Sequence, residues 1–598
     1  MKEYRVDALY STIFDVSFLV RYGYYDVSMK KTESTIIDNS ELEQYYGSPD
    51  SFYLKFLNLQ EFSNLLEKVN LREYFNFNKI DKNIRTEPVL FNIPKNQNTR
   101  RLYKMPNLYS YLELCYYISD NKSVFFDMYR DNVQSTSKFF NQLEFNYEFT
   151  KKIEQRLLYG GTNILSVDLS NFYHTLYTHS IPWVIEGKQA SKAKRFGGFA
   201  NEVDSILQQC QYGETHGVPT GNLATRLITE LYMCYIDKRM LKKGYTYSRY
   251  VDDIKFTFST ESQKESFLTD FSKICRENNL IINDKKTSEN PFPFTNNREK
   301  TEIFNYFDGL NKKNKSSSWI KKINEFWKFC IGEEAQGNKG AIKCMFSVVL
   351  NALRKKEIGA EKLTEIFITK ESYTRFNLYE MLLDTSLKDS RLTNRLMSFT
   401  EEIIKRGVNR EDVLSIVGDY LDSNCQMYRE KLRRCINNNW NQEVYQILLY
   451  CVVFEHSSLL GKDDIENVIS IDMDDYSICL AIIIWIKNGW AMYELLSILD
   501  HLLTETHMNY PERNNNRMSE KFWLTRYFIY YLIDHTSIFT DGINEYYQSV
   551  DASISELNKE YTIPKNEASP RINNFYNYLL DHKIPLIQLG KNNDFVYL

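Results

Sequence analysis

With 598 residues the chain is too long for one ordinary domain, so two to four domains are expected. Its 43% apolar and 25% charged residues are typical of a globular protein with large cores. A formal net charge of −4 argues against a general nucleic-acid coat protein, although one cleft could still be positive.

The cysteine pattern and the apolar runs bear on location. The ten cysteines contain no C-x-x-C pair, which predicts buried, reduced thiols in an intracellular protein. Acidic residues in the first 19 positions argue against a secretory signal, and the most apolar run, 476–486, is too short to span a bilayer. We expect a cytoplasmic protein.

The sequence pattern divides the chain in two. Alternating apolar residues predict strands at 163–168, 247–250 and 254–258. From about 315, apolar residues recur every three or four positions, as in 341–350 and 444–450, which predicts helices. The expected organisation is an α+β domain over 1–310 and an all-α helical-repeat domain over 311–598.

The first candidate site segment in chain order is a basic loop at 93–106. It contains Lys95, Arg100, Arg101 and Lys104 and no acidic residue. Such a loop could clamp a triphosphate.

Asp168 ends the apolar strand 163–168 and precedes a turn into a helix. A two-metal phosphoryl transfer needs carboxylates from separate strands, and Asp168 is a candidate for one of them. The simpler alternative is a helix N-cap.

A glycine–proline turn, His216 to Arg226, opens a helix that runs to about 240. A helix start behind such a turn suits a phosphate or base-pair contact at Thr220 and Gly221. An ordinary helix cap explains the pattern equally well.

The strongest local signal is Tyr250-Val-Asp252-Asp253, which lies between two alternating runs. This placement predicts a tight hairpin turn. Adjacent carboxylates repel unless a cation neutralises them, so Asp252 and Asp253 are candidate metal ligands together with Asp168. Taken alone, the motif could also be a solvated turn.

The last segment of this group, Asn278 to Thr287, predicts a helix end, a strand and paired lysines. Lys285 or Lys286 could face the triphosphate, whereas the alternative is a solvated charge pair.

In order and spacing, these segments resemble the fingers and palm of reverse transcriptases over residues 90–290. The resemblance implies two Mg²⁺ ions, with Mn²⁺ as a substitute, held by Asp168, Leu169, Asp252 and Asp253. It places the nucleotide against Leu169, Tyr173, Thr220, Gly221 and Lys286, besides the basic residues Lys95, Arg100 and Arg101. It also makes Tyr173 the steric gate that selects dNTPs.

A narrower resemblance covers nearly the whole chain. Arg21-Tyr-Gly-Tyr-Tyr25, Asp50-Ser-Phe-Tyr53, Met105-Pro-Asn-Leu-Tyr109, 168–183, Gly217-Val-Pro-Thr-Gly221 and 387–395 are similar to the AbiK family of abortive-infection reverse transcriptases. The family implies bacterial antiphage defence, a HEAT-like helical domain in place of the thumb, and homo-oligomers, with a hexamer suggested. It further implies DNA synthesis without a template from a protein hydroxyl, so the DNA product stays covalently attached. Tyr46 matches the priming position.

One departure and two rival functions remain. Templated reverse transcriptases usually carry Gln between Pro and Gly in the turn, where this chain has Thr220, which weakens the case for template positioning. The rivals are a templated, retron-like polymerase and a helical scaffold protein. Three further features are expected to be structural or open: the acidic run 472–475 as a helix cap, His174 and His179 as structural residues, and the basic stretch 187–198 as a DNA contact or a solvated loop.

Overall fold

The fold comes from a computed structural model of the 598-residue chain. It describes residues 6–25, 56–77, 80–81, 83–96, 98–140, 147–193, 197–294, 300–310, 315–471, 473–504, 517–539, 570–589 and 595–598. Every β-strand of these residues lies between 89 and 291, and all the described helices of ten residues or more after Lys300 belong to one helical stack.

The first part of the chain contains the strands and the helices that surround them. The elements are α1 (Val6–Ile13), α2 (Val16–Arg21), α5 (Gln60–Lys68), α6 (Leu71–Tyr74), β1 (Val89–Pro94), β2 (Arg100–Met105), α7 (Leu108–Asp120), α8 (Lys122–Asp131), α9 (Tyr147–Leu157), β3 (Asn163–Asp168), α10 (Phe172–Thr175), α11 (Ser180–Glu186), α12 (Lys188–Ala193), α13 (Phe199–Gln209), α14 (Leu223–Leu241), β4 (Ser248–Tyr250), β5 (Asp253–Phe258), α15 (Glu261–Glu277) and β6 (Ser288–Pro291).

A four-stranded antiparallel sheet with the order β4-β5-β3-β6 forms the base of this part. Alternate residues of β3 and β5 are buried, as the period-two pattern requires, among them Leu165, Val167 and Ile254. Helix α15 covers the sheet, and the ring of Phe267 stacks on Phe256 with centroids 4.2 Å apart. The expected strands at 163–168 and 254–258 are thus present.

Helix α14 is buried on nearly all sides, which matches its lack of a polar face. It contacts α7, α8, α11 and α15. It begins at Leu223, after Asn222 accepts a hydrogen bond from the amide of Thr225. The start of α14 therefore has a fixed position relative to the glycine–proline turn.

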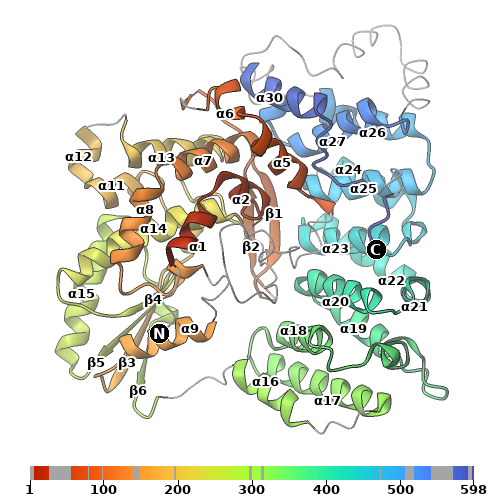
Figure 1. The fold of residues 1–598 in the computed structure, drawn as a ribbon, viewed down its shortest axis with the longest axis horizontal. Helices are drawn as coiled ribbons and strands as arrows, with labels where there is room; N and C mark the ends of the chain where they lie inside the picture. Colours follow the sequence, from red (N-terminus) through yellow and green to blue (C-terminus); the bar gives the residue numbers. More distant parts are fainter. Residues whose placement is uncertain are drawn as a thin grey trace.

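Strands β1 and β2 form a separate antiparallel hairpin with Val89 opposite Met105. The hairpin stands between the first part and the C-terminal helices, in the middle of Figure 1. It contacts α23 of the helical part.

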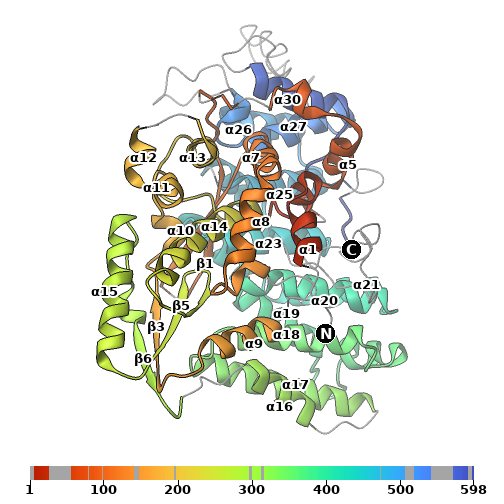
Figure 2. The same cartoon turned by 60° about the vertical axis from the view of Figure 1, so that its left-hand side comes forward.

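The second part consists of stacked helices, as the three- and four-residue spacing predicts. They are α16 (Lys300–Gly309), α17 (Ser316–Ala335), α18 (Ala341–Arg354), α19 (Leu378–Lys388), α20 (Thr393–Lys405), α21 (Arg410–Ser423), α22 (Cys425–Asn437), α23 (Asn441–Val453), α24 (Lys462–Ser470), α25 (Asp475–Lys487), α26 (Met492–Thr504), α27 (Trp523–His535) and α30 (Pro570–Asp581). Figures 1 and 2 show them rising from α16 and α17 at the bottom to α27 and α30 at the top. Within the acidic run, Asp474 caps a helix, because it accepts a hydrogen bond from the amide of Ser477.

The end of the chain returns to the first part. Phe575 of α30 packs on Phe62, Phe77 and Tyr109. The hydroxyl of Tyr576 donates to the side chain of Asn107 at 2.6 Å. The first part and the helical stack therefore share one continuous core.

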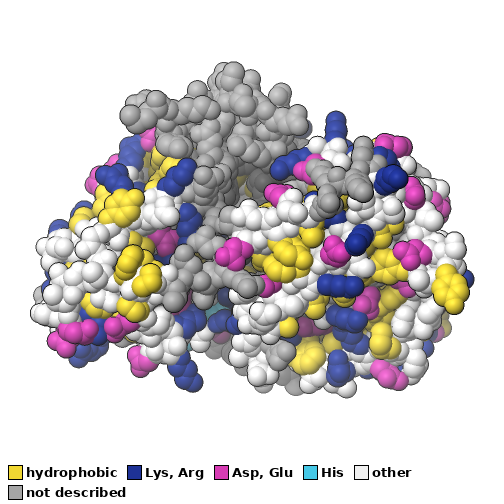
Figure 3. All heavy atoms as spheres, turned by 90° about the horizontal axis from the view of Figure 1, so that it is seen from below, with side chains coloured by type: hydrophobic (Ala, Val, Ile, Leu, Met, Phe, Trp, Pro, Cys, Tyr) yellow, Lys and Arg dark blue, Asp and Glu magenta, His cyan; other side chains and the backbone are white. Residues whose placement is uncertain are grey.

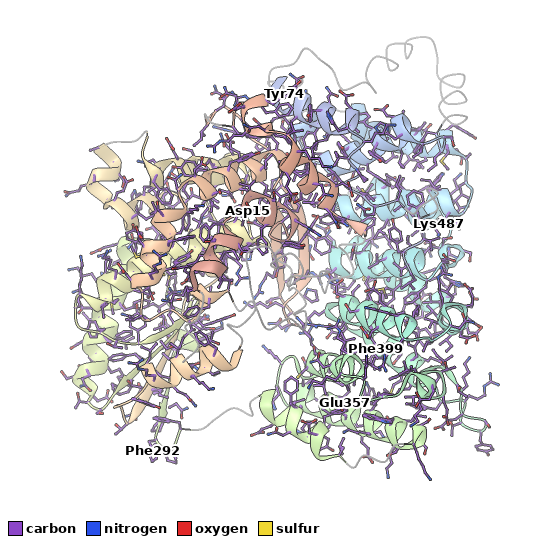
Figure 4. The ribbon with its side chains drawn as sticks, in the orientation of Figure 1. Asp15, Tyr74, Phe292, Glu357, Phe399 and Lys487 are labelled. Carbon is purple, nitrogen blue, oxygen red and sulfur yellow. The ribbon has the colours of Figure 1, made fainter. Side chains whose placement is uncertain are left out.

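Outside this core, the surface carries mixed charges and a few exposed apolar side chains. Positive and negative side chains are interspersed on the face seen from below (Figure 3). Phe292 projects from the sheet at the end of β6, away from the helical stack (Figure 4), and it is 73% exposed.

None of the described helices is both long enough and apolar enough to cross a membrane. All ten cysteines are free, and only Cys425 is not fully buried.

Candidate active site

The site begins at the turn between β4 and β5. Tyr250 pairs with Asp253, so Val251 and Asp252 form a two-residue hairpin turn, as expected. In the next strand Asp168 lies directly opposite Asp253. Two carboxylates on neighbouring strands and one in the adjoining turn thus lie at the same end of the sheet.

The backbone at Val251 is held in an unusual conformation. Its φ angle is +57°, in the left-handed region that β-branched residues avoid. Its amide donates to Ser137 Oγ at 2.9 Å, and its carbonyl accepts from Arg249 Nη1 at 3.0 Å. These two bonds offset the cost of the conformation and fix the direction of the Asp252 side chain.

Arg249 belongs to a buried ion network that the sequence analysis missed. Its fully buried guanidinium lies 2.8 Å from Glu230 and 2.7 Å from Asp237, both on α14. Burial alone would raise the pKa of Glu230, but Arg249 and hydrogen bonds from Ser135 and Ser137 outweigh it and lower the pKa to about 2. Glu230 and Asp237 are seven residues apart, which puts them on one face of a helix. This spacing is the only sign in the sequence that they could share a buried cation.

Lys286 and Asn283 hold the first carboxylate. Lys286 Nζ lies 2.7 Å from Asp168 Oδ2, and Asn283 Nδ2 donates to Asp168 Oδ1 at 3.1 Å. The amide of Asn283 also donates to the carbonyl of Asp168 at 2.8 Å. Of the paired lysines, Lys286 is therefore the one that reaches the site, and Asn283 is a contact that sequence reasoning did not single out.

The carboxylates raise one another's pKa. For Asp253, partial desolvation, a hydrogen bond to Asp168 and the charge of Asp252 raise the pKa to about 6. Desolvation and the charge of Asp168 also raise the pKa of Asp252, whereas Lys286 and Arg101 oppose that shift. Such a cluster of repelling carboxylates is what a divalent cation relieves.

The glycine–proline turn lies beside this cluster and is tightly packed. The amide of Val218 donates to the carbonyl of Tyr173 at 3.0 Å, and Thr220 Oγ1 donates to the carbonyl of Leu102 at 3.2 Å. Gly221 has φ +105°, and a Cβ there would lie 2.8 Å from Met105 Sδ and from the ring of Tyr103. The turn is thus wedged against the β1–β2 hairpin.

Tyr173 lies between the turn and the carboxylates. Burial raises its pKa to about 12; Arg226 and a hydrogen bond with Thr229 oppose the shift, and Asp252 adds to it. The ring therefore remains a neutral phenol beside the site.

The basic residues are divided between two places. Arg101 is exposed, and its charge opposes the rise in the pKa of Asp252. The pKa of His174 is lowered mainly by desolvation, and the charges of Arg101, Lys104 and Lys95 lower it further. Arg100 turns the other way, because its guanidinium is ion-paired to Glu443 of α23 and lies over the ring of Trp440. The structure thus brings Arg101 toward the carboxylates and Arg100 toward the helical stack.

Of the three remaining expected residues, Leu169, Tyr46 and His179, the structure describes the first and the last. Leu169 follows Asp168, is buried, and bridges to Ile282. Tyr46 lies outside the described residues. His179 Nδ1 lies 2.5 Å from Asp204 Oδ2.

The model of the family described as reverse transcriptase (RNA-dependent DNA polymerase) matches residues 118–302. The chain contains a reverse transcriptase domain. Domains of this family are described as RNA-dependent DNA polymerases. The matched residues include all three carboxylates, the glycine–proline turn and Lys286 of this domain.

Solved structures and curated proteins add little to the reverse transcriptase assignment. Apo telomerase from Candida tropicalis is 12% identical with a TM-score of 0.29, over 57% of this chain and 65% of the telomerase chain. Telomerase from Candida albicans in complex with a fragment of telomeric RNA is 13% identical with a TM-score of 0.26, over 57% and 64%. The chain thus spans less than two thirds of these telomerases, and scores this low carry no argument. No curated protein matches the chain.

Reverse transcriptase domains use divalent metal ions, typically Mg²⁺, and the donor set fits this use. Carboxylate oxygens are the ligands that Mg²⁺ prefers. As placed, the acidic, His and Cys side chains of the described residues do not converge in threes on one cation position. The ammonium of Lys286 instead neutralises Asp168.

Proposed function

We propose that the chain is a protein-primed, template-independent DNA polymerase that acts in abortive-infection antiphage defence. One observation carries the nucleotidyl-transfer part: Asp168 and Asp253 lie opposite each other on β3 and β5, with Asp252 in the adjoining turn. Carboxylates from two strands are what a two-metal site requires. The alternatives, a templated retron-like polymerase and a scaffold protein, are outcomes of the test below.

Each residue of the site has a role in this proposal. Asp168 and Asp252 would hold two Mg²⁺ ions with help from Asp253 and the Leu169 backbone, and the ions would activate the attacking hydroxyl and the triphosphate. Tyr173 would exclude a 2′-hydroxyl, and Thr220 and Gly221 would support the nucleotide. Lys286, Lys95 and Arg101 would contact the phosphates, whereas Arg100 would act there only after leaving Glu443.

The anchoring of the chain on either side of Tyr46 supports priming by that residue. Tyr25 and Phe56, which flank this segment, line a cavity of about 300 Å³ together with Gly221 and Tyr103. Tyr46 is ten residues before Phe56, and an extended chain of that length spans up to roughly 33–36 Å. A tether of that length would allow the phenol of Tyr46 to reach the glycine–proline turn, as priming by this residue requires.

The contacts of the hairpin support a reaction without a template duplex. Phe91 of β1 packs on Tyr445 and Tyr476 of the helical stack, with centroids 5.8 Å apart in both pairs. The amide of Asn92 donates to the side chain of Asn441 at 3.0 Å. The hairpin is thus packed against the stack. We propose that the stack stands where a thumb would be, that it is a HEAT-like repeat, and that the protein forms oligomers, with a hexamer as the suggested size.

The test is an incorporation assay without nucleic acid. Purified protein is incubated with Mg²⁺ and each labelled dNTP, and denaturing gels are run before and after protease treatment. Protein-primed synthesis predicts label that stays with the protein and is released by protease. Tyr46→Phe and Asp252→Asn should both abolish this label.

Matched variants separate the possible results. Tyr45→Phe removes the neighbouring phenol and should retain labelling. Label that requires added RNA and a primer would support the templated alternative and make Tyr46 a bystander. No incorporation under any condition, with correctly folded protein, would leave the scaffold alternative.

A further inference from the structure

A second cavity lies on the side of the domain formed by α11, α12 and α13, at the upper left of Figure 1. Its volume is about 670 Å³, enough for a nucleotide-sized ligand. Its lining residues include Tyr177, His179, Trp183, Lys192, Arg85 and Gly213. None of these residues belongs to the carboxylate site.

The charge balance of this cavity is positive, in contrast to the acidic chain. Asp204 is its one acidic lining residue. His179 Nδ1 lies 2.5 Å from Asp204 Oδ2, and Gln208 Nε2 donates to Asp204 Oδ1 at 2.7 Å, so this carboxylate is already satisfied. Arg85 and Lys192 remain, and neither has an ion pair among the described residues.

The guanidinium of Arg85 packs against the backbone of Gly213. A Cβ on Gly213, which has φ +82°, would lie 3.0 Å from the guanidinium carbon and two of its nitrogens. The absence of a side chain at Gly213 is what leaves room for the guanidinium against the backbone. An exposed guanidinium held in this way presents its donors to an anion in the cavity.

The aromatic residues give the cavity a stacking surface. Tyr177 and Trp183 meet edge to face with centroids 5.6 Å apart. Lys188 Nζ lies 4.2 Å from the Trp183 ring centre and Lys192 Nζ lies 5.9 Å from it. Aromatic rings beside cations are the combination by which proteins hold unpaired nucleotides without reading their sequence.

The cavity adjoins the catalytic part of the domain through Tyr177. Tyr177 is four residues after Tyr173 and bridges to His216, the first residue of the glycine–proline turn. The amide of Thr178 donates to the carbonyl of Thr215 at 2.9 Å. A strand that leaves or enters the carboxylate site could therefore continue into this cavity.

We propose that this cavity binds single-stranded polynucleotide, with bases stacked on Trp183 and Tyr177 and phosphates held by Arg85 and Lys192. The site is separate from the carboxylates, so its occupation does not depend on protein priming. The strand could be the protein's own product or a strand taken from solution, and both present the same chemistry.

The test is a fluorescence-anisotropy titration of the full-length protein with a labelled 12-nucleotide oligo-dT. Trp183→Ala should weaken binding by about tenfold, because one stacking platform is lost. Lys192→Glu and Arg85→Ala should each reduce the slope of log K against log salt by roughly 0.7, one phosphate contact on a single strand. Asp252→Asn should lose nucleotide incorporation and still bind the oligonucleotide, which separates this site from the proposed catalysis.

Matched controls keep the result interpretable. Tyr373→Ala removes a 98% exposed ring and Lys321→Glu reverses a 77% exposed lysine, both on the helical part. Trp183→Phe should restore most of the binding, whereas a folding defect would show as a lower melting temperature in Trp183→Ala. Equal affinity of Trp183→Ala and Tyr373→Ala, with both proteins folded, would overturn the proposal.

A second arm distinguishes the source of the strand. Protein allowed to react with dNTPs first should lose affinity for the free oligonucleotide if its own product fills the cavity. Unchanged affinity after the reaction would instead indicate a strand taken from solution. In either case the Trp183→Ala protein should show the weaker binding before the reaction.

Discussion

The ammonium of Lys286 lies 2.7 Å from Asp168 Oδ2, at the carboxylate that faces Asp253 across the sheet. Lys286 is about half exposed, so this ion pair is exchangeable at little cost. In the proposed mechanism the lysine and a divalent ion share one carboxylate. Lys286 is free to turn to a phosphate once the ion is bound.

This relationship predicts the behaviour of Lys286→Gln. We expect half-maximal incorporation at a lower Mg²⁺ concentration, by up to about fivefold, because a competing cation is removed. We also expect a lower maximal rate, because a phosphate contact is lost. Lys285→Gln is the matched control, and equal effects of both substitutions would contradict a specific role for Lys286.

The raised pKa of Asp253 predicts a pH dependence. Its carboxyl titrates near pH 6, and the protonated form is a poor metal ligand, so incorporation at limiting Mg²⁺ should rise as the pH increases through about 6. At saturating Mg²⁺ the midpoint should move to lower pH, because the ion favours the ionised form. Initial rates from pH 5 to 8 at two Mg²⁺ concentrations test this, and a midpoint that ignores Mg²⁺ would assign the titration to another group.

Arg249→Met should destabilise the protein strongly. It leaves Glu230 and Asp237 buried without their cation, a loss of about 3–5 kcal/mol in the free energy of unfolding. Because the folded pKa of Glu230 is depressed to about 2, its stabilisation is present above pH 4.5 and is lost as the pH falls toward 2. Urea unfolding measures both effects, and Arg239→Met, which breaks an exposed pair with Glu277, should cost less than about 1 kcal/mol.

Gly221→Ala should impair the site through both conformation and space. A side chain at φ +105° costs about 1–2 kcal/mol, and its Cβ would also collide with Met105 and Tyr103. Gly244→Ala has a similar φ of +89° with no atom within 4 Å, so it isolates the conformational cost. We expect Gly221→Ala to lower the melting temperature more than Gly244→Ala does, and to raise the KM for dNTP, which Gly244→Ala should leave unchanged. Identical results for the two variants would contradict a packing role for Gly221.

Tyr173→Ala should relax sugar selection. Without the ring beside the carboxylates, a 2′-hydroxyl no longer meets a steric barrier, and the preference for dNTP over rNTP should fall by about tenfold or more. Tyr173→Phe keeps the ring and should retain the preference. The measurement is the ratio of kcat/KM for matched deoxy- and ribonucleotides, and an unchanged ratio in Tyr173→Ala would assign the gate elsewhere.

Local patterns were enough for the strands and the turn of the candidate site. The period-two runs at 163–168 and 254–258 and the two residues between β4 and β5 placed Asp168, Asp252 and Asp253 correctly on strand ends and turn. That Asp168 lies close to Asp252 and Asp253 was predicted from the need of a metal site for several carboxylates, because no local sequence pattern indicates it. The buried partners Glu230, Asp237 and Arg249 were missed, because burial of a charge depends on what packs around it.

The sequence by itself determined the residue chemistry of the candidate site, the α+β part and the helical part, because periodicity and residue type are local properties. Only the tertiary structure decided which lysine reaches Asp168, that Arg100 turns to Glu443, and that α30 returns to pack on α7. These pairings join residues more than 100 positions apart. Many alternative partners have the right chemistry for each, and only the packing of the whole core selects one of them.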